Sequence, residues 1–257
     1  MSDGGAIDFH GSSIDVVGST FSGNSAKGSG GAIHVETGIA PLRLYGDTFA
    51  DNVADSDLNG SGKGGAVASG GNTTMQNTIL SGNKQSFFVG VYLQVDGDCD
   101  GAITSAFSVL KYKPSGCAIT GTYLTGDAVL GPLQDNGGPT KTRAVLAGSP
   151  AIDAGNPGGC ADPVGVPLLT DQRGAKRQLG ARCDIGAYER TLCGDANGDG
   201  TVNAADVFYL INHLFAAGPP PPGLANVNGD ASLSVSDVFY LINFLFGGGS
   251  APSCPGT

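Results

Sequence analysis

Two short segments near the C-terminus space their oxygen-bearing side chains as a cation-binding loop does. One runs from Asp195 to Asp206 and the other from Asn226 to Asp237. Each carries such side chains at loop positions 1, 3, 5 and 12, and position 7 can add a backbone carbonyl. Oxygens at this spacing converge on one Ca²⁺ at about 2.3–2.6 Å. The predicted ligands are Asp195, Asn197, Asp199, Thr201 and Asp206 in the first loop, and Asn226, Asn228, Asp230, Ser232 and Asp237 in the second.

The two loops are not equivalent as calcium sites. The first offers three carboxylates and the second only two, because Asn226 replaces an aspartate at position 1. Position 6 needs a sharp turn that favours glycine. It is Gly200 in the first loop and Ala231 in the second, where a left-handed alanine costs about 1 kcal/mol. The sequence therefore predicts two calcium ions, with the first site tighter. The alternative is that both segments are turns without metal. The identical spacing of loop and helix in the two copies disfavours this alternative.

A helix is predicted directly after each loop, and both helices contain the run VFYLIN. Apolar residues recur in each at helical spacing, and four phenylalanines widen the apolar stripe. We expect the two helices to pack together and bury these faces. The stripe comprises Val207, Leu210, Ile211 and Leu214, then Val238, Leu241, Ile242 and Leu245, with Phe208, Phe215, Phe239 and Phe246 beside them.

This duplicated loop-and-helix unit resembles the dockerin module over Cys193–Cys254. The resemblance implies calcium binding and docking onto a cohesin partner. It also implies partner contacts at loop positions 10 and 11. Dockerins often carry a Ser/Thr pair there and this chain does not, so the identity of the cohesin stays open, and docking to a different partner is the alternative. The matching positions are Ala204, Ala205, Val235 and Ser236.

Composition narrows the classes of partner. The chain has 257 residues, a net charge of −10 and no Lys/Arg cluster, which makes nucleic acid and anionic membranes poor partners. No apolar stretch is long enough to span a membrane. The N-terminal residues lack the basic start and apolar core of a signal peptide. We interpret the chain as the C-terminal part of a longer protein that is extracellular or displayed at the cell surface.

Six cysteines support an oxidising compartment, because none has the spacing of a zinc site. Six cysteines allow 15 pairings in principle. Their grouping along the chain favours three local disulfides, whereas a reduced cytosolic protein is the alternative. The expected pairs are Cys99 with Cys117, Cys160 with Cys183, and Cys193 with Cys254.

A second repeat occupies residues 1–85. The motif GGAI or GGAV recurs at Gly4, Gly30 and Gly64, and each copy is followed by an alternating stretch and then by a motif that ends in asparagine. Short β-rich segments at such periods, punctuated by glycine, indicate a solenoid. The paired glycines allow stacked backbones to approach closely at a corner. The recurring Asn24, Asn52 and Asn83 could stack as a ladder.

The GGAI repeats are similar to those of right-handed parallel β-helix proteins, including polymorphic outer-membrane adhesins. The expected fold is mainly β: a right-handed parallel β-helix over 1–190, with a small all-α dockerin-like module over 191–257. Residues 130–189 resemble the choice-of-anchor region that ends many β-helix surface proteins, with NGGPT, SPAIDAG, DQRG and DIGAYE as its motifs. This region is expected to form the final rungs and a terminal cap.

Five residues of this region could suggest catalysis by paired carboxylates with an arginine. A buried network of ion pairs is the favoured interpretation, because no histidine accompanies them. The three histidines, two of them on neighbouring rungs, are expected to have packing or surface roles. The five residues are Asp153, Asp171, Arg173, Asp184 and Glu189.

Three functions are consistent with the sequence, of which one is a purely structural stalk stabilised by calcium. In the favoured one this segment is non-catalytic, and an adhesin-like β-helix is attached through the calcium-dependent module to a cohesin-like partner, with a carbohydrate or cell-surface polymer as a further ligand. The alternative is a polysaccharide lyase or glycoside hydrolase in a cellulosome-like complex, with its active site largely upstream. Basic residues over 1–130 are few, and none lies beside an acidic cluster on a repeated strand.

Overall fold

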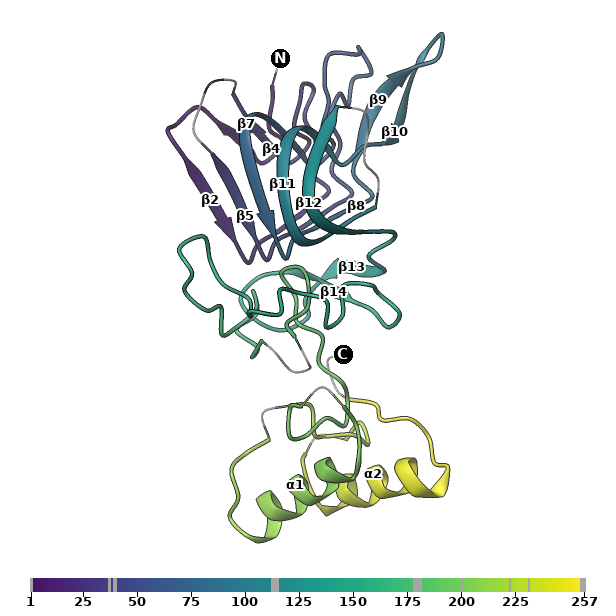
Figure 1. Ribbon diagram of the computed structural model, residues 1–257. Coiled ribbons are helices and arrows are strands. Elements are labelled where there is room, and N and C mark those ends of the chain that lie inside the picture. Colours follow the sequence, from purple (N-terminus) through teal and green to yellow (C-terminus); the bar gives the residue numbers. More distant parts are fainter. Residues whose placement is uncertain are drawn as a thin grey trace. The chain divides into compact units, whose positions relative to one another are not determined.

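The structure is a computed structural model that describes residues 2–36, 38, 41–111, 116–177, 182–199, 201–221, 223–230 and 232–254. The chain forms two compact units (Figure 1). One comprises the residues up to Arg177 together with Arg182–Glu189, and the other begins at Arg190.

The first unit is a parallel β-solenoid of about three turns. Its first face pairs β1, β4 and the starts of β7 and β11, and its second pairs β2, β5, β7, β11 and β12. The third face pairs β3, β6, β8 and the end of β11. The strands are β1 Ile7–Phe9, β2 Ile14–Val17, β3 Thr20–Ser22, β4 Ile33–Val35, β5 Leu42–Tyr45, β6 Thr48–Ala50, β7 Val67–Gln76, β8 Ile79–Ser81, β11 Cys99–Leu110 and β12 Cys117–Thr125.

Alternation along these short strands builds the core. Side chains at every second position point inward, as the strand period of two requires. Equivalent residues of successive turns therefore stack, as Ile33 does on Val67 and Phe21 on Phe49, whose rings lie 4.7 Å apart. Charged residues take the outward positions on the first two faces, where His34 accompanies Asp8 and Arg43 accompanies Asp15.

The paired glycines of the repeat lie where successive turns touch, as the sequence predicted. A Cβ atom added to Gly5 would lie 2.2 Å from the Gly31 carbonyl oxygen, and one added to Gly31 would lie 2.0 Å from that of Gly65. No side chain fits at such distances, so the corner requires glycine. The first glycine of each pair, such as Gly30 with φ +68°, also adopts the left-handed conformation.

The predicted asparagine ladder is confirmed and is one step longer than expected. The side-chain amide of Asn24 donates to Asn52 Oδ1, that of Asn52 to Asn83 Oδ1, and that of Asn83 to Asp98 Oδ1, each at 2.8 Å. Asn52 also donates to the Phe21 carbonyl at 3.0 Å. The ladder fixes the turn after the third strand of each rung and satisfies buried backbone groups.

Asn52→Ala is expected to lower the free energy of unfolding of the solenoid by about 2–3 kcal/mol. The substitution leaves several buried donors and acceptors without partners, and each costs about 1 kcal/mol or more. Chemical denaturation followed by circular dichroism measures the effect. Asn24→Ala at the half-buried end of the ladder is the matched control and should cost about 1 kcal/mol. Equal costs at both positions would contradict a cooperative ladder.

Residues after the last rung cover the outer surface of the third face. They include an antiparallel pair, β13 Leu130–Gln134 and β14 Thr142–Val145, followed by irregular chain. Thr20 donates to Gln172 at 2.6 Å and Ala187 donates to Thr48 at 3.0 Å, so the segment contacts successive turns. These contacts differ from those of a terminal cap: the segment runs along the side of the solenoid, beneath the rungs in Figure 1.

All three predicted disulfides are present. They join Cys99 to Cys117, Cys160 to Cys183, and Cys193 to Cys254. The second unit contains the two predicted helices, α1 Ala204–Phe215 and α2 Val235–Gly247. Among the residues that the structure describes, no helix has the length and apolar character needed to cross a membrane.

Candidate functional site

The two helices of the second unit start in the same way, and the position-12 aspartates set those starts. Asn203 and Ser234 are the N-caps. Asp206 and Asp237 accept the backbone N–H of their N-caps at 2.8 Å and complete a capping box in each copy. The same acidic side chains lie near the positive end of the helix dipole, where they stabilise the start of the helix.

Each of these aspartates also reaches back across its loop. Asp206 Oδ1 accepts the N–H of Asn197 at 3.1 Å, and Asp237 Oδ1 accepts that of Val227 at 2.8 Å. In the first loop, Asp195 Oδ1 accepts the N–H groups of Gly198 at 2.8 Å and of Asp199 at 3.0 Å. The loop ends are therefore drawn together, and the Asp195, Asp206 and Asp237 side chains are buried.

Positions 3 and 5 form the exposed side of each loop and have matching contacts. The Asn197 amide donates to Asp199 Oδ2 at 2.9 Å, and the Asn228 amide donates to Asp230 Oδ2 at 2.8 Å. The side-chain hydroxyl of Thr201, together with Asn197, lowers the pKa of Asp199. A bond from the Ser232 backbone N–H, with Asn228, lowers the pKa of Asp230. Both carboxylates are thus ionised at neutral pH.

One buried oxygen of the second loop could serve as a cation ligand. Asn226 Oδ1, at position 1, is buried and accepts no hydrogen bond from any residue that the structure describes, while its amide nitrogen donates to the Asp230 carbonyl at 2.8 Å. A buried acceptor without a partner is costly unless a ligand supplies one. A cavity of about 410 Å³ opens beside it, lined by Asn226, Asp230 and the apolar Leu224 and Leu233. The all-oxygen donor set suits a hard cation such as calcium.

Within the described part of the chain, no three Asp, Glu, His or Cys side chains converge as a ready-made metal site. Each loop instead mixes carboxylate and amide oxygens, so calcium would have to draw its ligands closer. The position-6 residues Gly200 and Ala231 lie outside the described residues. The backbone N–H groups of Thr201 and Ser232 bond to Asp199 and Asp230, so position 7 is held alike in both copies.

The structure differs from one expectation about which residues of the two helices are buried. Val207 and Leu210 of α1 and Val238 and Leu241 of α2 share a buried core, as predicted. The four phenylalanines that were expected to widen the buried stripe point to solvent instead. Their exposed fractions are 69% for Phe208, 67% for Phe215, 66% for Phe239 and 71% for Phe246. Because one helical position turns by about 100°, a residue next to a core position falls outside a stripe of this width.

The four predicted partner-contact residues lie on the first turns of the two helices. Ala205, Val235 and Ser236 are exposed and Ala204 is half-buried. Phe208 and Phe239 follow them by three or four positions and so share their side of each helix. Each copy therefore presents small first-turn residues followed by an exposed phenylalanine.

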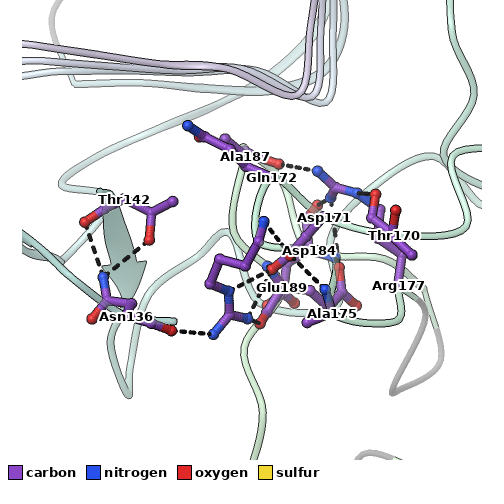
Figure 2. Close-up of polar contacts among 12 residues, drawn as sticks. Asn136, Thr142, Thr170, Asp171, Gln172, Ala175, Arg177, Asp184, Ala187 and Glu189 are labelled. Atoms are coloured by element: carbon purple, nitrogen blue, oxygen red, sulfur yellow. Dashed lines mark hydrogen bonds and ion pairs between the residues drawn. The ribbon is translucent and has the colours of Figure 1, made fainter. Parts of the chain in front are cut away.

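The carboxylates and arginines of the lateral segment form a buried network (Figure 2). Asp171 Oδ2 accepts from Arg173 Nε at 2.9 Å and from the Glu189 N–H at 3.0 Å. Arg173 also donates to the Glu189 carbonyl at 2.7 Å, and its guanidinium lies 3.7 Å from the Tyr188 ring centroid. Glu189 Oε2 accepts the Asp184 N–H at 2.9 Å. Asp153 is exposed, and its backbone N–H donates to Asp184 Oδ1 at 2.8 Å.

The sequence interpretation missed Arg177, which lies at the centre of this network. Its side chain is 1% exposed, and Nη1 lies 3.6 Å from Glu189 Oε2. Nη2 donates to the Gly186 carbonyl at 2.9 Å (Figure 2 includes its side chain), and further bonds reach Thr170 and Asp184. The buried guanidinium of Arg177 thus binds buried backbone carbonyls and a buried carboxylate. Such contacts are typical of a structural network rather than a substrate site.

Asp47 lies close to this network and gives the solenoid a pH dependence. Burial raises the pKa of Asp47 to about 8, although N–H bonds from Ser19 and Tyr45 and the charge of Arg177 oppose the shift. Because this pKa exceeds the ordinary 3.8, the contribution of Asp47 to stability is complete below about pH 4 and is lost as pH rises through about 8.

Denaturation midpoints measured between pH 4 and 8 should therefore fall more steeply for the wild type than for Asp47→Asn. The asparagine cannot accept both N–H bonds, so the variant should be less stable at pH 4. Its stability should nevertheless change less with pH, and parallel pH curves for the two proteins would contradict the assignment.

Comparison with known proteins agrees with this geometry at both ends of the chain. Residues 193–246 match the dockerin type I domain, and residues 18–36 match the Chlamydia polymorphic membrane protein repeat. No curated protein matches the chain, and no solved structure does. The dockerin match spans both loops and nearly all of both helices, and dockerin domains bind calcium and imply a cohesin partner.

Proposed function

We propose that this chain is part of an extracellular or surface-displayed protein and that its module at residues 193–246 attaches it to a cohesin-like partner. The observation that carries the proposal is the dockerin type I match over two loops whose aspartates both cap a helix and close the loop. The solenoid is the part that is held in place, and no catalytic role is assigned to it. A right-handed coil fits its parallel strands and the resemblance of its repeats.

Calcium would supply a charge that gathers the loop oxygens and stiffens the start of each helix. In the first loop, Asp195, Asp199 and Asp206 would hold it with the side-chain oxygen of Asn197 and the backbone of Thr201. In the second, the buried Asn226 side-chain oxygen would hold it with Asn228, Asp230, the backbone of Ser232 and Asp237. The centre of the docking surface would then be the first turns of the two helices, at Ala204, Ala205, Val235 and Ser236.

Binding of the full chain to purified cohesin modules encoded in the same genome tests the proposal. Surface plasmon resonance should show binding in calcium and at least about tenfold weaker binding in EGTA, because metal binding and folding of such loops are linked. The double variant Ala205→Arg, Ser236→Arg should weaken binding. The control Val164→Arg, at an exposed position of the solenoid unit, should not. Absence of binding to every such module, or equal binding in EGTA, would refute the proposal.

The two sites are expected to differ in affinity. Asp206→Ala should remove the tighter calcium site and loosen α1, whereas Asp237→Ala should mostly remove the weaker one. The difference follows from the extra carboxylate of Asp195 in the first loop and from the alanine that replaces glycine at position 6 of the second, and the two together amount to about 1–3 kcal/mol. Calorimetric titration of each variant measures it. Loss of the tighter site on Asp237→Ala would show that the loops have been ranked in the wrong order.

A further inference from the structure

A hairpin of the solenoid unit carries an exposed apolar tip. It consists of β9 Lys84–Phe88 and β10 Tyr92–Asp96, which pair antiparallel and project from the rungs (Figure 1). No charged residue occurs from 85 to 95. Six large apolar side chains at the tip are between 37% and 62% exposed: Phe87, Phe88, Val89, Val91, Tyr92 and Leu93.

Both faces of this tip are apolar. Phe88 opposes Tyr92 on one face, with ring centroids 5.0 Å apart, and Phe87 opposes Leu93 on the other. A hairpin that packs against one protein surface buries one of its faces and usually keeps the other polar. Here neither face is polar, so an environment that surrounds the tip fits it better than a surface on one side.

The base of the hairpin is fixed, in contrast to its tip. Ser86 Oγ donates to Asp55, and Gln94 donates to the Asp55 carbonyl at 2.9 Å. Gln85, on the opposite face, accepts the N–H of Gly64 at 2.9 Å. Where the base meets the tip, Tyr92 packs so closely on Gly60 that a Cβ added to Gly60 would lie 2.2 Å from the ring. The exposed apolar end is therefore held away from the rungs.

We propose that residues 87–93 insert into the interfacial layer of a lipid surface. A stable protein interface needs about 800 Å² and 20–30 residues from each partner, and the tip offers only seven residues. A bilayer needs no shape complementarity, surrounds both faces, and favours aromatic side chains at its interface. The absence of charge on the tip and the net charge of −10 select zwitterionic rather than anionic lipid.

The absence of tryptophan from the chain gives a direct test with the intact protein. Phe88→Trp places a single tryptophan at the tip, and Leu169→Trp places one at another apolar position, which is 74% exposed. On addition of phosphatidylcholine vesicles, emission of the Phe88→Trp protein should shift to the blue and be quenched by lipids with brominated acyl chains. Emission of the Leu169→Trp protein should not change.

Vesicle co-sedimentation gives the second measurement. The triple variant Phe87→Ser, Val91→Ser, Leu93→Ser should lower the bound fraction about tenfold, whereas the matched variant Val164→Ser, Leu169→Ser should leave it unchanged. If the emission shifts to the blue without lipid and the sedimenting mass doubles, the tip is covered by a second copy of the chain. That result would overturn the proposal. No shift with vesicles, or equal binding by the triple variant, would also overturn it.

Discussion

Glu189→Ala is expected to lower the free energy of unfolding of the solenoid unit by about 3–5 kcal/mol, because it leaves the buried charge of Arg177 without its ion-pair partner. The two side chains are 2% and 1% exposed. The Asp184 N–H loses its acceptor in the same step. Urea denaturation of the full chain, followed by near-ultraviolet circular dichroism, measures the change.

An exposed ion pair provides the matched control. Asp15 pairs with Arg43 on the outside of the second face, where both side chains are about one-third exposed. Asp15→Ala should therefore cost no more than about 1 kcal/mol. If Glu189→Ala costs no more than Asp15→Ala, the lateral network does not hold the segment onto the rungs.

Replacement of Cys193 and Cys254 by serine is expected to lower the stability of the C-terminal module by about 4 kcal/mol through the entropy of loop closure. The bridge spans 61 residues and encloses both loops and both helices. A module of this size has little core, and much of its stability should depend on such a link. The far-ultraviolet helix signal during thermal unfolding reports on this module, because both described α-helices belong to it.

The Cys160–Cys183 bridge separates this effect from a general loss of disulfides. It lies in the other unit and spans 23 residues. Its removal should destabilise the solenoid unit and leave the helix transition in place. A helix transition that is insensitive to the loss of Cys193–Cys254 would show that the bridge does not stabilise the module.

Most of the solenoid could be predicted from the sequence, because its repeat is enforced by hard constraints. Paired glycines mark corners where backbones touch, and asparagines mark a ladder of buried amides. Both constraints restrict a position to one residue type, so they remain visible in a single sequence. Asp98 was missed as the last step of the ladder because its rung lacks the motif of the others.

The lateral position of the 130–189 segment was not predicted, although the strands contain a signal for it. Outward positions on the first two faces carry charges, such as Asp8 and Arg43. The third-face strands TFS, TFA and ILS carry none, and Ile79 and Val109 point into a separate cluster with Val145 and Ile185. A strand that is apolar on both sides needs a cover on both sides.

The sequence spacing of the oxygen-bearing residues was enough to predict the two loops, because the predicted ligands of each loop lie within twelve consecutive positions. The exposure of the four phenylalanines could not be predicted from sequence spacing. Helical periodicity gives the direction of the stripe, but its width depends on how much of it the small core of the module can cover. Ile211, placed in the buried stripe by its spacing, is also exposed, at 37%.

The central claim is that two unequal calcium loops organise a docking module. Calorimetric titration of calcium into the metal-stripped full chain tests this claim most directly. Two binding events of different affinity are predicted, and the double variant Asp206→Ala, Asp237→Ala should abolish both. An absence of calcium binding by the wild type, or full binding by the double variant, would contradict this account.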